Sequence, residues 1–323
     1  FHHPEVTPIV DVGDCRVLEL FWGPTLSFKD HALQVLARLL DREVDHGVVL
    51  GATSGDTGSA AIEACRGSDH LKVVILYPEG RVSDFQRRQM TTVPDANTQA
   101  VAVRGTFDDC QRMVKEAFAS NEHLLAINSI NWTRVAAQAG FHVHAAARMG
   151  APFDLVVPTG NFGNVYSAWV AKQMGAPIET ITIANNANHG LSDLVNTGSM
   201  AEAVVTPTMA PAMDIQVPSN LERFEASPGA EFRAGWSNDA QISETMEEVH
   251  QRYGYLLDPH TATAWRAGEE TKSSRPQLVV ATAHPAKFDD SVPPPEWFDP
   301  IDGLEERLMS IGPDTSELEA LIR

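Results

Sequence analysis

The sequence is poor in several residue types, and cysteine is the most informative of these. Cys15, Cys65 and Cys110 are the three cysteines among 323 residues. So few, and an odd number, argue against a disulfide framework and fit a reducing compartment. Their spacing matches no metal site, so we expect no metal and three buried or half-buried thiols. No apolar run approaches the ~20 residues that span a bilayer, so we expect a cytoplasmic protein without a membrane partner.

Positive charge is also scarce. The chain has 24 Lys and Arg against 43 Asp and Glu, for a formal net charge of −19. Such a field repels polyanions, so we expect no nucleic-acid partner. An anionic substrate would have to be met by local positive groups. With 43% apolar and 21% charged residues, the chain has the composition of an ordinary globular protein long enough for two domains.

Short β-rich runs alternate with helical stretches, which predicts an α/β fold with parallel sheets and helices on both faces. The expected strands are 48–50, 72–77, 100–103, 124–128, 155–157, 180–184 and 278–281. The expected helices are 30–41, 57–66, 108–120, 131–149, 163–174 and 242–253. We expect irregular connection with short helices over 200–240 and an extended surface turn over 292–296. Parallel sheets of this kind place ligand loops at the carboxyl ends of their strands.

Lys29 lies in the segment GPTLSFKD, behind a rigid turn, beside apolar residues and at the expected start of a helix. Burial disfavours the ammonium form and lowers the pKa of a lysine. An amine that is neutral near pH 7 can condense with an aldehyde to form a Schiff base. A solvated lysine at a helix start is the common alternative. Whether Lys29 is interpreted as catalytic therefore depends on the other motifs.

The segment PTGNFGN, residues 158–164, reads as strand, glycine turn and helix. Glycines there let backbone N–H groups converge on an anion, and the helix adds its positive end. The spacing matches neither the dinucleotide fingerprint nor a P-loop, so we expect a small phosphate monoester. The candidate residues are Gly160, Asn161, Phe162, Gly163 and Asn164. An ordinary turn between strand and helix is the alternative.

A third loop, GATSGDTG at residues 51–58, has the same strand-turn-helix character. Hydroxyl and N–H groups at Ser54, Gly55 and Thr57 suit a carboxylate, although Ser54 or Asp56 could simply cap the helix. Two anion-binding loops and a candidate Schiff-base lysine together indicate pyridoxal 5'-phosphate, whose aldehyde needs the lysine and whose phosphate needs the glycine loop.

Five motifs occur in a fixed order: PTLSFKD, ATSGDTG, NSINWTR, PTGNFGN and TAHPAKF. Together they resemble the threonine synthases, pyridoxal-phosphate enzymes of the tryptophan-synthase-β-like fold, and the resemblance runs from Phe1 to the helix near Arg323. It implies fold type II, with two open, mainly parallel sheets flanked by helices. It also implies a smaller α/β domain over 44–149 and a larger one over 1–43 and 150–323 that carries the cofactor lysine and phosphate loop. The family's segment ahead of the equivalent of Phe1 is absent from this sequence.

NSINWTR places amides, a hydroxyl and a guanidinium at an expected helix start. A guanidinium can grip phosphate through a bidentate fork, although a cap followed by a surface arginine is the alternative. The resemblance makes this set the binding site of the substrate's phosphate: Asn128, Ser129, Asn131 and Arg134.

Thr282 ends the last expected strand. The resemblance places it at the cofactor's ring nitrogen, where a neutral hydroxyl makes a weaker electron sink than a carboxylate. The alternative for Thr282 is simple β propensity, and His284 is interpreted as structural.

Asp56 faces the cofactor's phenolic oxygen in the arrangement that the resemblance implies. A carboxylate would be repelled by a phenolate. Three arrangements therefore stay open: a raised pKa, a turn toward the cofactor-linked nitrogen, or contact with another cation such as Lys29.

The resemblance implies a carbon–oxygen lyase that converts O-phospho-L-homoserine and water into L-threonine and phosphate. Lys29 would hold the cofactor and then move protons at the α and β carbons. Two rivals remain: a phospho-lyase or ammonia-lyase of the same fold that releases a 2-keto acid, and a non-catalytic truncated homologue. We expect a monomer or a homodimer.

Overall fold

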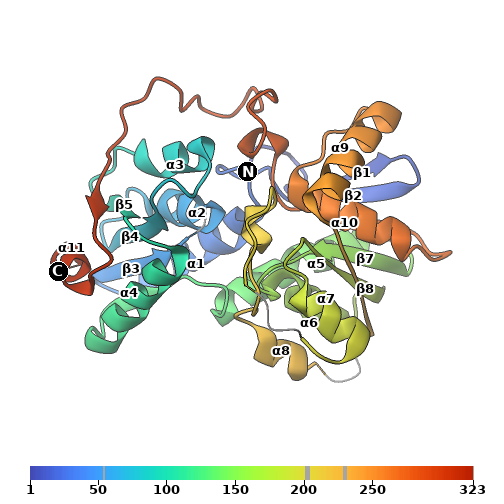
Figure 1. Cartoon of the computed structure of the whole chain (residues 1–323), viewed down its shortest axis with the longest axis horizontal. Helices are drawn as coiled ribbons and strands as arrows, with labels where there is room; N and C mark the ends of the chain where they lie inside the picture. Colours follow the sequence, from blue (N-terminus) through green and yellow to red (C-terminus); the bar gives the residue numbers. More distant parts are fainter. Residues whose placement is uncertain (54, 201–203, 228–230, 323) are drawn as a thin grey trace. The chain divides into compact units, whose positions relative to one another are not determined.

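The computed structural model describes residues 1–53, 55–200, 204–227 and 231–322, which form two compact units (Figure 1). The larger unit comprises Phe1–Phe28 and Trp132–Pro294, and the smaller comprises Lys29–Asn131 and Pro295–Arg323. These bounds differ from the expected division at 44–149. The helix that Lys29 begins and the C-terminal segment belong to the smaller unit, whereas the helix after Asn131 belongs to the larger.

The larger unit is built on a six-stranded sheet in which β1 pairs antiparallel with β2 and all other neighbours are parallel. Its strands, in spatial order, are β1 (Ile9–Val12), β2 (Cys15–Glu19), β10 (Gln277–Ala281), β7 (Phe153–Pro158), β8 (Ile178–Asn185) and β9 (Phe232–Trp236). The central strands β7 and β10 are buried throughout, as expected for parallel strands covered on both faces.

Helices cover both faces of this sheet. One apolar cluster joins the sheet to α5 (Trp132–Met149) and α6 (Gly163–Gln173), and a second joins it to α9 (Asp239–Tyr253) and α10 (Pro259–Glu270). The shorter elements of the unit are α7 (Gly190–Thr197), η1 (Pro211–Met213), α8 (Leu221–Glu225) and η2 (Pro285–Lys287).

The smaller unit contains a five-stranded sheet whose strands are all parallel. Its spatial order is β11 (Ser310–Ile311), β5 (Thr98–Val103), β4 (Leu71–Pro78), β3 (Gly47–Ala52) and β6 (Leu124–Ala126). On one face lie α1 (Lys29–Glu43), α2 (Asp56–Cys65) and α3 (Asp84–Thr91). On the other lie α4 (Phe107–Ser120) and α11 (Thr315–Ile322).

Local capping explains where several helices begin. Capping boxes start α3 at Ser83, α4 at Thr106 and α9 at Asn238. In each box the cap side chain and the third helical residue satisfy one another's backbone N–H groups. Asp258 caps α10, whose first residue is Pro259, a favoured position because the missing N–H has no intrahelical partner there.

The expected strands and helices are all present, with bounds shifted by a few residues. The region 200–240 was wrongly expected to lack strands, because it contains β9, which pairs with β8 from Ile181↔Phe232 to Asn185↔Trp236. That strand includes Arg233 and Gly235 and is only partly buried, so its sequence carries a weak β signal. Cys15, Cys65 and Cys110 are buried and unpaired thiols, as expected.

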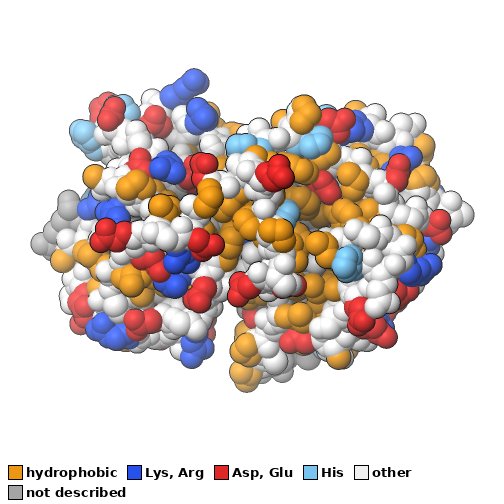
Figure 2. All heavy atoms as spheres, turned by 90° about the horizontal axis from the view of Figure 1, so that it is seen from above, with side chains coloured by type: hydrophobic (Ala, Val, Ile, Leu, Met, Phe, Trp, Pro, Cys, Tyr) orange, Lys and Arg blue, Asp and Glu red, His pale blue; other side chains and the backbone are white. Residues whose placement is uncertain are grey.

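The surface reflects the acidic composition. On the face drawn in Figure 2, basic side chains are dispersed among acidic ones. In the part of the chain that the structure describes, no helix has both the length and the apolarity that a membrane crossing needs.

Candidate active site

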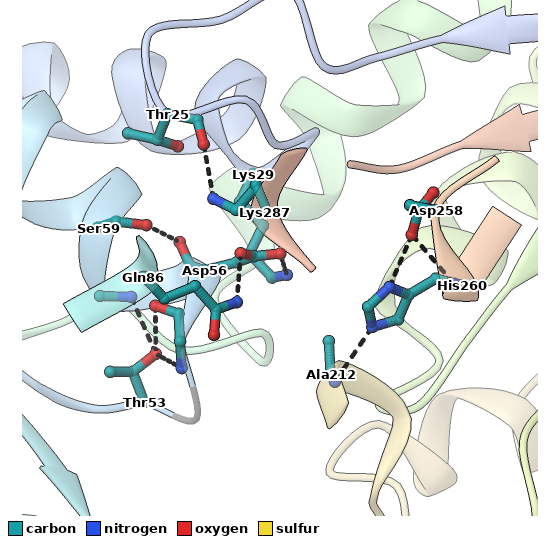
Figure 3. Close-up of polar contacts among 12 residues, drawn as sticks. Thr25, Lys29, Thr53, Asp56, Ser59, Gln86, Ala212, Asp258, His260 and Lys287 are labelled. Carbon is teal, nitrogen blue, oxygen red and sulfur yellow. Dashed lines mark hydrogen bonds and ion pairs between the residues drawn. The ribbon is translucent and has the colours of Figure 1, made fainter. Parts of the chain in front are cut away.

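Lys29 and Asp56 are brought together in the smaller unit. Each is the first residue of its helix, α1 and α2 respectively. Lys29 Nζ lies 3.3 Å from Asp56 Oδ2, and the two side chains are 12% and 3% exposed (Figure 3). Of the three arrangements left open for Asp56, the structure shows the contact with Lys29. A carboxylate so close stabilises the ammonium form of the lysine, which opposes the effect of burial.

The turn between β3 and α2 is organised by Thr53. Its hydroxyl oxygen accepts hydrogen bonds from the N–H groups of Gly55 and Gly58, both at 2.9 Å, and donates to the carbonyl of Gly55 at 3.0 Å. Gly55 has φ +143°, a conformation that suits glycine. Thr53 therefore fixes the loop, a role that the sequence reasoning missed. Of the expected carboxylate-binding residues, Gly55 is the N-cap of α2 and Thr57 lies in the first turn of that helix, whereas Ser54 lies outside the described residues.

The second loop of the smaller unit follows β6. Asn131 N donates to the carbonyl of Asn128 at 3.2 Å, and Asn131 Nδ2 donates to the carbonyl of Ala126 at 3.1 Å. Leu50 of β3 is paired with Ala126 of β6. Asn128 lies two residues beyond Ala126, and Ala52 lies two residues beyond Leu50. Asn128, Ser129 and Asn131 thus occupy the same carboxyl edge of the sheet as the Thr53 turn.

The glycine loop lies in the larger unit, between β7 and α6. The N-cap of α6 is Phe162, in the left-handed region with φ +63°, and no side chain caps this end. The first N–H groups of a helix have no intrahelical partners, so the start of α6 can receive an anion. A Cβ added at Gly160 would meet the carbonyl oxygen of Ala212 at 2.9 Å and Met213 Cα at 3.0 Å. Position 160 therefore has no room for a side chain, and the uncapped start of α6 offers N–H groups of the kind that suit a phosphate.

The candidates of the glycine loop differ in what their side chains do. Asn161 Oδ1 accepts a hydrogen bond from Ser219 N at 3.0 Å, and its carbonyl accepts from Asn220 Nδ2 at 2.8 Å. The Phe162 ring is fully buried against Phe224 and Phe232. Phe162 can therefore offer only its backbone to a ligand.

Asn164 is 5% exposed and is held by a histidine of α5. Its Oδ1 lies 2.8 Å from His142 Nε2, and burial lowers the pKa of His142 to about 4. The imidazole is therefore neutral at physiological pH. Among the described residues, Asn164 Nδ2 is buried and has no hydrogen-bond partner, which leaves a donor at the start of α6.

Thr282 directly follows β10 and is 6% exposed. Its carbonyl accepts a hydrogen bond from Phe28 N at 2.8 Å. Val279 of β10 is paired with Val156 of β7. Thr282 follows Val279 by three residues, and Thr159 follows Val156 by the same number. Thr282 therefore shares the carboxyl edge of the sheet with the glycine loop. His284 caps η2 by accepting a hydrogen bond from Ala286 N, which fits a structural interpretation.

Arg134 lies in the first turn of α5 and is 3% exposed. Burial lowers its pKa to about 10, so it keeps its charge at neutral pH. It belongs to the larger unit, whereas Asn128, Ser129 and Asn131 belong to the smaller. The residues expected to bind the substrate's phosphate are thus divided between two units.

Gln86 is a second residue that the sequence reasoning missed. Its Nε2 donates a hydrogen bond to Asp56 Oδ1 at 2.8 Å. The spacing Ser83-x-x-Gln86 is the signature of a capping box, so the sequence could have located the start of α3. It gives no sign that the same side chain reaches a residue 30 positions away.

Comparisons with known proteins agree with this chemistry. The family described as "Pyridoxal-phosphate dependent enzyme" matches residues 17–283. A threonine synthase of Pseudomonas aeruginosa is 41% identical over 90% of this chain and 72% of its own length. The solved structure of a threonine synthase from Brucella melitensis with bound pyridoxal phosphate matches with a TM-score of 0.92 and 39% identity, covering 100% of this chain and 81% of that one.

The solved threonine synthase from yeast matches with a TM-score of 0.89 and 34% identity, again over 100% of this chain and 81% of that one. Identities of this size over most of both chains exceed what a shared fold alone explains. The cofactor is therefore pyridoxal phosphate, and the chain belongs to the pyridoxal-phosphate-dependent enzymes and, within them, to the threonine synthases.

Proposed function

We propose that this chain converts O-phospho-L-homoserine and water into L-threonine and inorganic phosphate, in the cytoplasm and as a monomer or a homodimer. The observation that carries the proposal is the contact of 3.3 Å between Lys29 Nζ and Asp56 Oδ2 at the starts of two helices, in a chain 41% identical to a threonine synthase. When bound, the cofactor supplies an electron sink for the substrate's α carbon.

Lys29 is assigned two tasks. Its amine would hold the cofactor through the aldehyde group, and it would move protons at the α and β carbons of the substrate. The Lys29 side chain is 12% exposed, so little of it is in contact with solvent. Asp56 stabilises the protonated amine, so Lys29 can hold the proton taken from one carbon until it is delivered to the next.

The two helix starts are assigned to different anions. The loop at α6 binds the cofactor's phosphate through backbone N–H groups, and Thr282 meets the ring nitrogen. The loop at α2 binds the substrate's carboxylate. The residues assigned to the cofactor's phosphate are Gly160, Asn161, Phe162, Gly163 and Asn164, and those assigned to the carboxylate are Ser54, Gly55 and Thr57.

The leaving phosphate is assigned to Asn128, Ser129, Asn131 and Arg134. Arg134 supplies the positive charge that a doubly anionic group requires in a chain with a formal net charge of −19. Amide and hydroxyl groups of the other three supply neutral donors. These side chains are not needed to bind the cofactor, so their effects should appear in substrate kinetics.

The variant Lys29→Ala tests the central assignment. We expect it to lose the visible absorbance band of the bound cofactor and nearly all formation of threonine and phosphate, while its circular dichroism stays that of the wild type. Lys115→Ala, which removes an exposed lysine of α4, is the matched control and should keep both. A Lys29→Ala protein as active as the wild type would remove Lys29 from the mechanism.

Product analysis distinguishes the rivals. With O-phospho-L-homoserine, a threonine synthase releases threonine and phosphate in equal amounts, whereas a lyase of the same fold releases a 2-keto acid, ammonia and phosphate. A protein that binds the cofactor but forms no product from this substrate would contradict the proposal.

A further inference from the structure

Gln86 belongs to the capping box that starts α3. Ser83 Oγ accepts a hydrogen bond from Gln86 N at 3.1 Å, and Gln86 Oε1 accepts one from Ser83 N at 3.4 Å. The side chain is 1% exposed. A capping box requires only this acceptor from its third helical residue. The amide of Gln86 also has a donor, Nε2.

This donor contacts Asp56. Gln86 Nε2 donates to Asp56 Oδ1 at 2.8 Å, while Asp56 Oδ2 faces Lys29 Nζ at 3.3 Å (Figure 3). An ionised carboxylate only accepts and the Ser83 N–H only donates, so the contacts at both ends require the same orientation of the Gln86 amide. The two oxygens of Asp56 are thus divided between an amide donor and the lysine.

Packing also fixes Gln86 against the start of α2. A Cβ added at Gly55 would lie 2.4 Å from Gln86 Oε1 and 2.5 Å from its Cδ and Nε2. The Gln86 amide therefore occupies the space that any side chain at Gly55 would need. The glycine at position 55 therefore leaves room for the Gln86 amide where it lies in the structure.

Two of the groups around Asp56 show how its carboxylate is placed. From α1, the charged Lys29 contacts the carboxylate. Ser59 of α2 donates to the backbone carbonyl of Asp56, at 3.2 Å, and not to the carboxylate. With Asp56 4% exposed, loss of the amide donor would leave a buried carboxylate oxygen without that hydrogen bond, which favours protonation or rotation of the side chain.

We propose that Gln86 is a positioning residue, whose amide holds the Asp56 carboxylate directed at the nitrogen of Lys29. The role of this contact in catalysis rests on the proposed function. The contact itself does not, and both measurements below are made without O-phospho-L-homoserine.

The first test uses Gln86→Glu in the protein without cofactor. Glutamate is a standard third residue of a capping box, so α3 keeps its start and only the amide donor is lost. Two carboxyl groups in contact cannot both ionise cheaply, so one keeps its proton in the folded protein to a higher pH than in the unfolded chain. Stability is then lost as pH rises through this raised pKa. Relative to wild type, the unfolding equilibrium constant should increase at least about tenfold between about pH 5 and pH 8. If the ratio of the unfolding equilibrium constants of variant and wild type does not change with pH, the proposed contact is wrong.

The second test uses Gln86→Met in the protein with bound cofactor. Methionine has a similar length and cannot donate, so the charge facing the Lys29 nitrogen weakens. The visible absorbance of the cofactor reports protonation of that nitrogen. We expect the midpoint of its pH titration to fall by about one unit, a tenfold loss of proton affinity. An unchanged midpoint would overturn the positioning role.

Two comparisons separate positioning from a general effect on folding. Ser83→Ala removes the helix cap but keeps the Gln86 amide, so it should lower stability and leave the titration midpoint at the wild-type value. In an Asp56→Asn background, Gln86→Met should cause no further shift. If Ser83→Ala moves the midpoint as far as Gln86→Met, the effect belongs to helix packing and the proposal is wrong. Failure of the proposed function would instead appear as a wild-type protein that forms no threonine.

Discussion

At the scale of single residues, Arg134 carries its charge in a buried position. It is 3% exposed, and burial lowers its pKa to about 10. Burying a guanidinium costs solvation free energy, which an anion can offset. Arg148, in the last turn of the same helix, is 30% exposed, and its Nη2 lies 2.8 Å from Glu5 Oε2.

Replacing Arg134 with Ala tests its assignment to the leaving phosphate. Loss of a charge-assisted contact with a desolvated phosphate costs at least ~2 kcal/mol, so kcat/KM for O-phospho-L-homoserine should fall by roughly 30-fold or more. The absorbance spectrum of the bound cofactor should not change. Arg148→Ala, which removes a surface ion pair worth at most about 1 kcal/mol, should leave both nearly as in the wild type.

The opposite pattern would reassign Arg134. Arg134 and the glycine loop belong to the same unit, so a variant that loses its cofactor but keeps turnover when saturated with it would place Arg134 at the cofactor's phosphate. A variant unchanged in both measurements would leave it with a structural role.

At the scale of elements, the loop between β7 and α6 depends on close backbone approach. Gly160 contacts the backbone of η1, where an added Cβ would lie 2.9 Å from the Ala212 carbonyl oxygen. Backbone atoms cannot move aside as a flexible side chain can. Gly160→Ala should therefore displace the loop and weaken cofactor binding at least about tenfold, equivalent to ~1.4 kcal/mol, as measured by titration of the cofactor-free protein.

Gly140 provides the matched control. It lies in α5, is exposed, and an added Cβ would meet nothing within 4 Å. Gly140→Ala should stabilise the protein by about 0.5–1 kcal/mol through helix propensity and leave cofactor affinity unchanged. Equal cofactor affinities of the Gly160→Ala and wild-type proteins would show that the phosphate binds elsewhere.

Element bounds were predictable where a local signal exists. The Asn238 cap and Gly254 bracket α9, and the glycine turn precedes α6. The short strands β9 and β11 have no comparable signal. They form because β8 and β5 offer open edges, and such edges exist only after the sheet has assembled.

At the scale of the whole molecule, buried histidines link stability to pH. Burial lowers the pKa of His142 and of His284 to about 4, from the ordinary value of 6.5. Between these values the unfolded chain binds a proton at each site that the folded protein does not. Stability therefore rises with pH across this window and is lost as pH falls through it.

His142→Gln tests this dependence at the more deeply buried histidine, which is 1% exposed. The wild-type protein should lose on the order of 3 kcal/mol of stability through this histidine between about pH 6.5 and pH 4. In denaturant unfolding of the cofactor-free protein, the unfolding free energy of the variant should lack this part of the pH dependence. His250→Gln, which removes an exposed imidazole of α9, is the control. If the unfolding free energy of His142→Gln falls with decreasing pH as steeply as that of the wild type, the lowered pKa of His142 is contradicted.

The division into units was only partly predictable. The alternation of strand and helix indicated parallel sheets flanked by helices, because that pattern is local in the chain; the division into two parts came from the family resemblance. It gave no reason to place 295–323 with the smaller unit. That placement depends on contacts of the folded chain, such as the pairing of Ile311 with Val103 and the burial of Leu318 beside α4.

The sequence by itself determined the fold class and the cofactor, and it predicts the lysine and the two anion-binding loops, because glycine turns, helix starts and apolar runs act over a few residues. Tertiary structure alone decided what Asp56 faces, that Thr53 fixes its loop, and that the ring of Phe162 is core. It also decided that Gln86 reaches Asp56. Such contacts join residues far apart in the chain, and their geometry is set by how helices pack on a sheet, which no local pattern specifies.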